Sequence, residues 1–533
     1  MGSVGGRASP GVKLPTVKLD TTLVELYKRA CPKDTHTRLG WVSCGVTSGI
    51  DLTPDFPRNT KFVYEDQAFI ATPHHELNNG NGRLQRSLAK KYLSHIPQRD
   101  AFISGNTPVV LFNLGQTPEQ IEHDRREAEA TISVLDPSQR PELIFCPGPS
   151  KIPMKEHKID KLEYKVTVDG LEDYPLTHDL ETHWHLNSKA ALARSGLPTP
   201  KSDIIETEGY PPAAGACCNL CTAAAKDTSR LPTIPPGCTG PRGEWLSSQT
   251  NRILDAIRAR PVPFVFKTQQ AFGGAGTWLV TSADHKAKLL TDLSGSTTGS
   301  EGGGLLRKLL SLLTPANAHL HPTTTLLTDL IPTPQASSNS SSSSSSSDYG
   351  LTFCVPSSGG KPHFLAAAEQ ILTTDGSSAW VGSTIAYARQ DELHDRFSGL
   401  MEQVAAWVAQ RGYVGLVGVD VLLPDSKEED GLVVDLNVRT CGSVSLALLR
   451  GHFFTERGLG WAGSFSIAVR GGRKGFVEKW RGLFEEGRMV ILSWYEDVGG
   501  GESIADVVVG AEDQAGLGEL MGRVKEGTEE VTF

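Results

Sequence analysis

Continuous apolar runs and helical apolar spacing alternate in the first third of the chain. The runs TPVVLFNL and PELIFCPG, residues 107–114 and 141–148, are bounded by turn residues, as is typical of buried strands. Between them, residues 119–135 (EQIEHDRREAEATISVL) have the apolar spacing of a helix. This alternation predicts an N-terminal α/β domain over residues 21–165, preceded by a disordered segment, residues 1–20.

A second helix is predicted for FSGLMEQVAAWVAQRG, residues 397–412, where Gly412 can end the helix. Its apolar residues recur at helical spacing and are expected in the core: Phe397, Leu400, Met401, Val404, Trp407 and Val408. Farther along, residues 488–524 predict strands followed by a helix. A domain over residues 456–533 is therefore expected to complete the fold.

The segment GLVGVDVLLPDSKEEDGLVVDLNVRTCGS predicts a hairpin with strands at residues 415–423 and 432–439. If Leu423 faces Leu432, counting inward places Asp420 directly opposite Asp435. Two carboxylates at such a cross-strand separation repel each other unless something positive lies between them.

Strand alternation places Asp435, Asn437 and Arg439 on one face of this hairpin. Carboxylate and amide oxygens are hard ligands suited to Mg²⁺, with Mn²⁺ as an alternative, and a nearby arginine can meet an anion held by the metal. The other interpretation is that both acids are solvated on an exposed face, as most acidic side chains are. Asp420 favours the metal because it interrupts an otherwise apolar strand.

In FVFKTQQAFGGAGTWLV, residues 264–280, Lys267 ends an apolar run and is followed by Gly273, Gly274 and Gly276. A fixed cation beside backbone N–H groups without side chains suits a phosphate chain. Because turns of this composition are common, the pattern indicates a phosphate site only in combination with the acidic hairpin.

Over residues 185–450 the sequence resembles the ATP-grasp superfamily, chiefly its carboxylate–amine ligases. SKAALARSGLPTPKSDI resembles the opening segment of that family, FVFKTQQAFGGAGTWLV its second lysine and glycine loop, and TLLTDLIPT its adenine hinge. GLVGVDVLL and VVDLNVR are similar to its two metal-bearing strands. The family usually has E-x-N-x-R at the second strand, whereas this chain has Asp at position 435, one methylene shorter.

The resemblance implies roles for individual residues. Lys189 and Lys267 would contact the nucleotide phosphates, and backbone groups of Asp329 and Ile331 would bond the base. The remaining implied residues are Gly273, Gly274 and Gly276 as the phosphate cradle, Asp420, Asp435 and Asn437 as metal ligands, and Arg439 with Lys267 as catalytic residues. Glu369 is expected on a strand near the site, either contacting substrate or metal or lying on the surface.

The implied fold is α/β (α+β), an ATP-grasp fold with the N-terminal α/β domain and a nucleotide cleft between two α+β subdomains. The subdomains are a lid, residues 166–332, with a Cys-containing insertion at 211–242, and a metal-bearing unit, residues 349–455. Between them lies a Ser-rich flexible loop, residues 333–348, whose flanking strands we expect within one compact unit.

The implied reaction consumes ATP with Mg²⁺. A substrate carboxylate attacks the γ-phosphate to give an acylphosphate and ADP, and an amine then displaces phosphate. The partners would be small-molecule carboxylates and amines. A protein that binds ATP on this fold without ligase activity is the alternative.

Charge and hydropathy argue against nucleic acid and membranes as partners. The 52 Lys and Arg against 61 Asp and Glu give a formal charge of −9, which disfavours nonspecific nucleic-acid binding. No apolar run is long enough to span a membrane, and the N-terminus lacks the apolar region of a secretory signal. We therefore expect no membrane association and a cytoplasmic location.

Nine cysteines, an odd number, suit a reducing compartment. Four of them gather in the insertion: Cys217, Cys218, Cys221 and Cys238. Two interpretations remain open, a four-thiolate zinc knuckle and a Pro/Gly-rich insertion with free thiols, since a second C-x-x-C pair is missing. A zinc knuckle would also be compatible with a different function for the protein, that of a metal-thiolate or interaction module.

Overall fold

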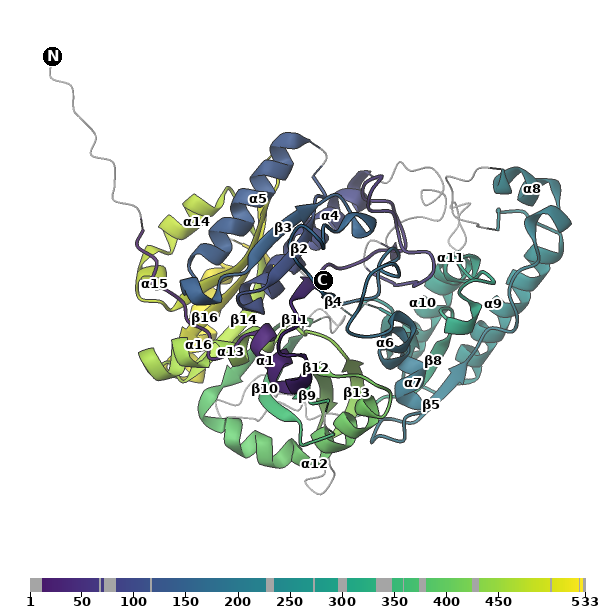
Figure 1. Cartoon of the computed structure of the whole chain (residues 1–533). Helices are drawn as coiled ribbons and strands as arrows, with labels where there is room; N and C mark the ends of the chain where they lie inside the picture. The colour runs from purple at the N-terminus through teal and green to yellow at the C-terminus, as the bar shows by residue number, and fades with distance from the viewer. Residues whose placement is uncertain are drawn as a thin grey trace, which may run out of the picture.

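The described strands form three β-sheets (Figure 1). The computed structural model describes residues 12–66, 69–70, 83–115, 117–226, 234–271, 274–295, 304–331, 348–357, 359–372, 380–423, 431–498, 501–526 and 528–530. Among the described helices, none has both the length and the apolar composition needed to cross a membrane.

The first sheet is parallel, in the order β3-β2-β1-β4. Its strands are β1 (Leu39–Val42), β2 (Pro108–Phe112), β3 (Glu142–Cys146) and β4 (Lys161–Tyr164). The helices of this part are α1 (Leu23–Ala30), α4 (Arg83–Ser104) and α5 (Pro118–Ser133). The predicted strands at 107–114 and 141–148 and the predicted helix at 119–135 are therefore confirmed. Helix α5 begins where expected because Thr117 caps it and Pro118 occupies its first turn.

The disordered N-terminus predicted for residues 1–20 is wrong for the described part, residues 12–20. Val17 donates a backbone hydrogen bond to the Val134 carbonyl at 2.8 Å, and Leu19 donates one to Gln139 Oε1 at 2.8 Å. Both side chains are buried. A few apolar residues in a polar, Gly-rich segment give little periodic signal. They are held here by residues at 134–139, which are distant in sequence.

The second sheet is antiparallel, in the order β5-β8-β6-β7, and we call it the lid sheet. Its strands are β5 (Ser202–Ile205), β6 (Phe264–Thr268), β7 (Thr277–Val280) and β8 (Thr325–Asp329). The helices around it are α6 (Leu180–Leu186), α7 (Lys189–Ala193), α8 (Asn219–Ala225), α9 (Pro241–Ala259), α10 (Ala283–Ser294) and α11 (Leu305–Ser311). Apolar residues of α9, α10 and α11 share one buried cluster with the first sheet, which joins the lid to the N-terminal part.

The third sheet is the largest, and its main path runs β13-β12-β9-β10-β11-β14-β16-β15. Its strands are β9 (Asp348–Val355), β10 (His363–Leu372), β11 (Trp380–Ala386), β12 (Gly415–Leu422), β13 (Leu432–Asn437), β14 (Trp461–Arg470), β15 (Met489–Glu496), β16 (Glu502–Ala511) and β17 (Glu529–Glu530). The C-terminal strands thus continue the sheet that carries the acidic hairpin.

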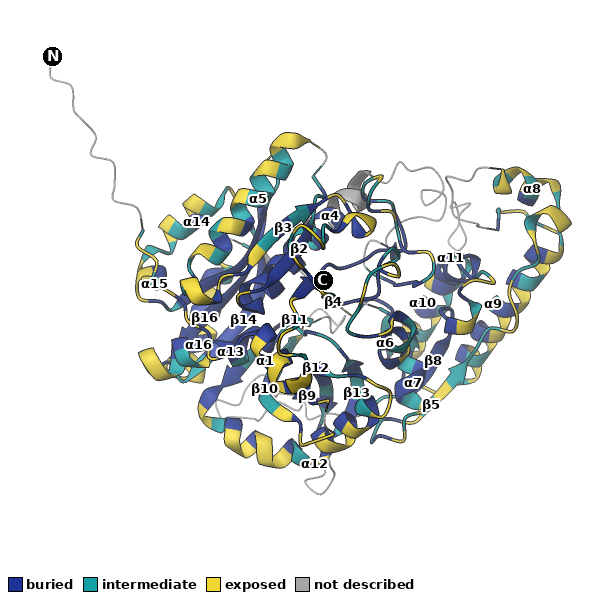
Figure 2. Ribbon diagram, in the orientation of Figure 1, coloured by how far each residue is buried: buried dark blue, intermediate teal, exposed yellow. Residues whose placement is uncertain are grey.

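Helices cover this third sheet and bury its apolar residues (Figure 2). They include α12 (Gln390–Ala409), α13 (Val444–Leu448), α14 (Arg473–Lys479), α15 (Arg481–Glu485) and α16 (Gln514–Lys525), together with α4 and α5, which pack against β15. All six residues that the sequence assigned to the core from 397–408 are buried on α12. Gly412 follows the helix with φ +81°, as its predicted role as a helix terminator requires.

The strands that flank the Ser-rich tract do not belong to one compact unit, so that prediction is wrong. β8 lies in the lid sheet and β9 in the third sheet. Residues 332–347 themselves lie outside the described residues. Strand periodicity reports which residues are extended, but it does not say which sheet a strand joins.

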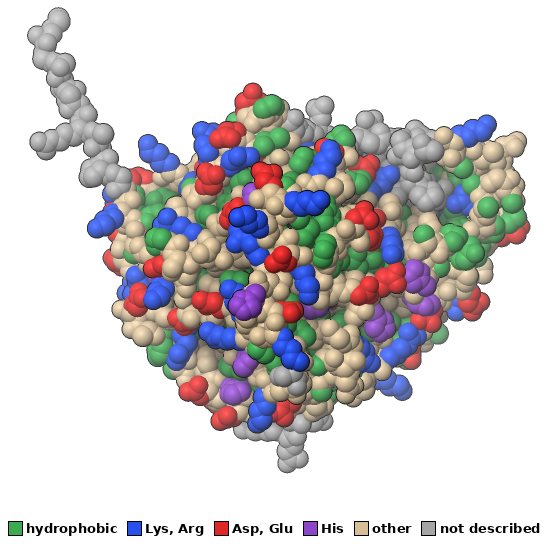
Figure 3. All heavy atoms as spheres, viewed as in Figure 1, with side chains coloured by type: hydrophobic (Ala, Val, Ile, Leu, Met, Phe, Trp, Pro, Cys, Tyr) green, Lys and Arg blue, Asp and Glu red, His purple; other side chains and the backbone are tan. Residues whose placement is uncertain are grey.

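The predicted mixed α/β class is confirmed by one parallel and two antiparallel sheets. Two antiparallel units with helices, preceded by a parallel α/β unit, are also the architecture that the ATP-grasp resemblance implies. On the face shown in Figure 3, Lys and Arg side chains are interspersed with Asp and Glu rather than gathered in one patch. The visible surface therefore offers no continuous basic track for nucleic acid.

Candidate active site

Asp420 and Asp435 are cross-strand neighbours in the third sheet, as the sequence predicted. The register that produces this pairing differs from the expected one. Leu422, not Leu423, pairs with Leu432, and the register shifts by one residue between Asp420 and Val421. The extra residue is Val434 on β13, a β-bulge that the period-two pattern of a strand does not reveal.

Two lysines from different elements meet this acidic hairpin. Lys189 is the first residue of α7, where Ser188 caps the helix by accepting a hydrogen bond from the Ala191 amide at 3.1 Å. Its ammonium forms an ion pair with the carboxylate of Asp435. Lys267, near the end of β6, donates a hydrogen bond to the Val434 carbonyl at 2.7 Å. The lid and the third sheet are thus joined through the two lysines that the sequence assigned to phosphate contacts.

The electrostatics of these four side chains are strongly coupled. Burial, followed by the neighbouring charge of Asp435, raises the pKa of Asp420 to about 8. Burial also disfavours ionisation of Asp435, but Lys189 and Lys267 outweigh it and lower the pKa of that carboxyl. Burial and the charge of Lys189 lower the pKa of Lys267 to about 8. The two lysines therefore favour the ionised form of Asp435. Asp420 lacks a comparable cation beside it.

A cavity of about 230 Å³ opens over the hairpin. Six predicted site residues line it: Lys189, Gly274, Asp420, Asp435, Asn437 and Arg439. Lys267 lines a smaller adjoining pocket, which also touches Lys189, Leu326 and Val434. The N-terminal part contributes Gly45, Ile96, Arg99 and Lys165 to the larger cavity, so its wall comes from all three sheet-bearing regions.

Arg439 is held in place by a residue that the sequence interpretation missed. Asn187, at the end of α6, accepts hydrogen bonds at Oδ1 from Arg439 Nη1 at 2.8 Å and from the Val438 amide at 2.9 Å. Asn187 stands two residues before Lys189, directly ahead of the segment that begins at Ser188, and this proximity was the only signal available.

A buried ion pair in the N-terminal part contacts the residues that follow β13, next to Arg439. Lys165 donates to both carboxylate oxygens of Asp100, at 2.9 and 3.1 Å, and the Thr440 hydroxyl donates to Asp100 at 2.8 Å. All three residues are buried. No motif marked Asp100 or Lys165, because neither is close in sequence to the hairpin.

Gln370, and not its neighbour Glu369, is the residue of β10 that contacts the acidic pair. Gln370 Nε2 donates to Asp420 at 2.6 Å, whereas Asn437 Nδ2 donates to the other oxygen of Asp420 at 3.3 Å. Glu369 instead pairs with Arg389 at 3.4 Å, and burial raises its pKa despite that arginine. Adjacent residues of β10 point to opposite faces, so only one of them can reach the cavity.

The glycine turn after Lys267 adopts backbone conformations that favour glycine. Gly274 and Gly276 have φ +78° and +76°. A Cβ on Gly276 would meet Thr268 Oγ1 at 2.2 Å, whereas one on Gly274 would meet no described atom within 4 Å. Gly276 is therefore required by packing, and Gly274 leaves its backbone open toward the cavity. Gly273 lies outside the described residues.

Asp329 and Ile331, predicted to contact the base, do not line either of these two cavities. The Asp329 amide donates to the Lys201 carbonyl at 2.9 Å, and its carboxylate pairs with Arg260. Leu326 and Thr328, just before them on β8, do line the smaller pocket. Contact of the base with Asp329 and Ile331 remains a prediction.

The donor set of the hairpin fits a divalent cation. Asp420 and Asp435 present carboxylate oxygens from paired positions, and Asn437 contributes an amide whose oxygen and nitrogen are interchangeable by a flip. The raised pKa of Asp420 reflects its partial burial and the neighbouring charge of the half-buried Asp435, without enough positive charge between the two carboxylates. A Mg²⁺ ion would supply that charge.

No protein-family model and no curated protein matches this chain. Among solved structures, N5-carboxyaminoimidazole ribonucleotide synthetase from Thermus thermophilus is similar at 12% identity and TM-score 0.41, covering 80% of this chain and 93% of that one. N5-carboxyaminoimidazole synthase from Aspergillus clavatus, in complex with ADP and 5-aminoimidazole ribonucleotide, has 9% identity and TM-score 0.42, with 92% and 98% covered. Biotin carboxylase from Campylobacter jejuni has 11% identity and TM-score 0.40, with 79% and 85% covered. At these identities and scores, we draw no conclusion about the chemistry of this chain from the likeness.

Proposed function

We propose that this protein is an ATP-dependent ligase that activates a substrate carboxylate as an acylphosphate and couples it to an amine. The observation that carries the proposal is the meeting of Asp420 and Asp435 with Lys189 and Lys267 at one cavity and its smaller adjoining pocket. Cations and paired carboxylates brought together from separate elements are the groups needed to hold a metal-bound polyphosphate. The order of the sequence motifs supports the same assignment.

In this proposal, Lys189 and Lys267 neutralise the nucleotide phosphates. A cation about 4 Å from a phosphate charge contributes about 4 kcal/mol at an effective dielectric near 20, before desolvation is subtracted. Without nucleotide, both lysines are satisfied by the hairpin, one by Asp435 and the other by the Val434 carbonyl. Phosphate oxygens would exchange with these partners, which keeps the lysines oriented before ATP arrives.

Asp420, Asp435 and Asn437 would hold Mg²⁺. When bound, this ion would neutralise charge on the phosphoryl group that is transferred. Arg439, fixed by Asn187, would stabilise the negative charge that develops on the phosphoryl group or on the acyl intermediate. Gly274, with its open backbone, would let main-chain N–H groups approach the phosphates.

The N-terminal part would bind the acid to be activated. Arg99 and Lys165 line the cavity, and both are buried next to acidic partners. Arg99 lies 3.5 Å from Asp506, and Lys165 lies 2.9 Å from Asp100. In this proposal the carboxylate of the substrate would bind beside these paired cations, near the phosphates held by the lid lysines.

The test is incubation of the full chain with Mg·ATP and pools of organic acids and amino acids. Release of ADP and phosphate that depends on both an acid and an amine, together with a new amide detected by mass, is the expected result. ADP release without an amide in any pool would contradict ligation. Release of AMP and pyrophosphate would contradict the acylphosphate route.

A second candidate is an ATP-binding protein without ligase activity. It is favoured by one observation, the aspartate at position 435 where the family resemblance leads us to expect glutamate. Saturable binding of Mg·ATP with no turnover in any substrate pool would support this candidate. The Asp435→Glu variant separates the two, because gain of turnover in that variant alone would identify the shorter side chain as the cause.

A further inference from the structure

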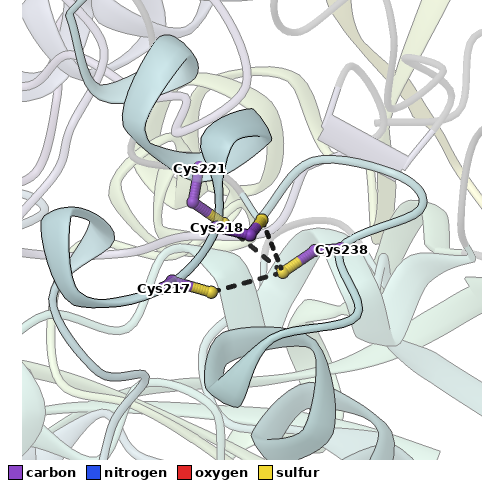
Figure 4. A group of neighbouring side chains, drawn as sticks. All are labelled: Cys217, Cys218, Cys221 and Cys238. Carbon is purple, nitrogen blue, oxygen red and sulfur yellow. Dashed lines mark hydrogen bonds between the residues drawn. The ribbon is translucent and has the colours of Figure 1, made fainter.

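Four cysteines converge on the lid, away from the proposed ligase site (Figure 4). Their sulfurs lie within 4.8 Å of one another. Cys238 is the centre of the group, with its Sγ at 3.5 Å from Cys217, 3.7 Å from Cys218 and 3.4 Å from Cys221. They come from two described segments, residues 214–226 and 234–240. The second segment leads into the first turn of α9 and packs against it.

We propose that these four thiolates bind one structural Zn²⁺ ion. With Zn–S bonds of about 2.3 Å, the sulfurs of a tetrahedral site lie about 3.8 Å apart. The three distances to Cys238 are close to this value. They are much longer than a disulfide bond of about 2.05 Å, and all nine cysteines are free thiols in the structure.

The local backbone is shaped around the four sulfurs. Cys218 precedes the first turn of α8, so the C-x-x-C spacing brings Cys221 back to the same side one helical turn later. The backbone of Cys221 at the start of α8 is the main cause that lowers the pKa of the Cys218 thiol, to about 7, which favours the thiolate that binds metal. On the other segment, Gly237 has φ +74° and directs the chain through a turn into Cys238, whose amide donates to the Pro235 carbonyl at 3.2 Å.

Glycines leave room for the cluster where side chains would collide with it. A Cβ on Gly240 would lie 2.8 Å from Cys217 Sγ, and one on Gly243 would lie 1.9 Å from the Cys238 carbonyl oxygen. The second glycine therefore lets the start of α9 pass directly against the cysteine turn.

Two arginines beside the cluster complement its charge. A Zn²⁺ ion with four thiolates carries a net charge of roughly −2. Arg242 interacts electrostatically with Cys221, and Arg307 does so with Cys238. Arg307 also donates to the Ile234 carbonyl at 2.8 Å and to the Pro235 carbonyl at 3.3 Å, so it holds the turn that presents Cys238.

The role of this ion would be structural. Four protein ligands fill a tetrahedral zinc site and leave no position for water or substrate. In Figure 1, α8 lies at the outer edge of the lid, far from β12 and β13, and none of the four cysteines lines the cavity over the acidic hairpin. The ion would fasten the insertion to α9 and so stiffen the outer part of the lid, independently of what the ligase site binds.

The test is metal analysis of the full-length protein purified without chelators. One zinc per chain is expected, retained through gel filtration and released by a thiol-modifying reagent. Cys221→Ser and Cys238→Ser should each lower the zinc content to a small fraction of this value. Cys31→Ser, which alters a buried thiol outside the cluster, should keep it.

Cobalt gives an independent measurement on the unaltered chain, which does not depend on whether variants fold. Replacement of zinc by Co²⁺ should produce the thiolate-to-metal charge-transfer absorption and the intense visible bands of a tetrahedral cobalt site. Metal-free protein with four titratable thiols, or a mass showing a disulfide within the cluster, would overturn the proposal. Stoichiometric iron in place of zinc would also overturn it.

Discussion

Lys267 on the lid donates a hydrogen bond to the carbonyl of Val434, 2.7 Å away on the third sheet. Val434 is the extra residue of the bulge between the Asp420–Asp435 pair and the Val421–Val433 pair. A bulge leaves its extra residue out of the strand ladder, so this carbonyl is released to accept from another element. The same irregularity that brings the two acids opposite each other thus also anchors the lysine that would neutralise the nucleotide.

We expect Lys267→Ala and Asp435→Ala each to abolish ATP-dependent phosphate release. Lys267→Ala removes a cation that would contact the phosphates, and Asp435→Ala removes a ligand of the proposed metal. Loss of such a group lowers kcat by roughly 10²-fold or more. Phosphate release should be measured alongside circular dichroism and Tm, which should remain near those of the unaltered protein. Asp255→Ala, on an exposed part of α9, is the matched control and should retain activity. Full activity in either site variant would refute the assigned site.

Nucleotide affinity is expected to weaken as the pH rises above about 8. Burial and Lys189 lower the pKa of Lys267 from 10.5 to about 8, so in the folded protein Lys267 loses its charge across this interval while the unfolded chain keeps it. Between these two values the folded state binds fewer protons, and the contribution of Lys267 to stability rises with pH. The affinity for phosphate falls over the same pH range, because binding needs the charged form of Lys267.

The Kd of a non-hydrolysable ATP analogue, measured as a function of pH, checks this expectation. In Lys267→Arg the guanidinium stays charged throughout, so the decline in affinity over this interval should be reduced. An identical pH profile in both proteins would mean that another group controls binding.

Alanine at Gly276 should be more damaging than alanine at Gly274. Both residues have positive φ, which costs a residue with a Cβ roughly 1–2 kcal/mol. Only at Gly276 would the new Cβ also collide with Thr268 Oγ1, at 2.2 Å. Urea denaturation and analogue binding of the two variants provide a matched comparison. Equal losses of stability would show that the contact with Thr268 relaxes without cost.

Removing Asp100 should destabilise the folded chain strongly. Asp100→Asn leaves Lys165 buried without its ionic partner, and breaking a buried pair from one side costs about 3–5 kcal/mol. The free energy of unfolding by urea measures this loss. The exposed pair Arg258–Asp255 is the control, and Asp255→Asn should change stability by about 0.5 kcal/mol or less. A small loss at Asp100 would indicate that water reaches Lys165.

Several features of the site followed from local sequence. The hairpin and the pairing of Asp420 with Asp435 depend on a short connection between two apolar strands, and the apolar spacing of α12 identified its buried face. The buried face of α12 was predicted because helical periodicity is a property of neighbouring residues, whereas the pairing of the two acids was correct because the bulge offset the one-residue error in the assumed Leu423–Leu432 register. The bulge at Val434 was missed, since one extra residue hardly changes such a pattern.

The remaining contacts were decided only by how the three sheets pack. Lys189 meets Asp435 across 246 positions of sequence, and Thr440 meets Asp100 across 340. Gln370 rather than Glu369 reaches the acids because the register of β10 fixes which of two adjacent residues faces the cavity. The sequence by itself determined the elements and the chemical groups they carry, because these depend on short-range periodicity and residue type. The tertiary structure decided which groups share a cavity, because burial and charge pairing depend on surfaces that meet only after the chain has folded.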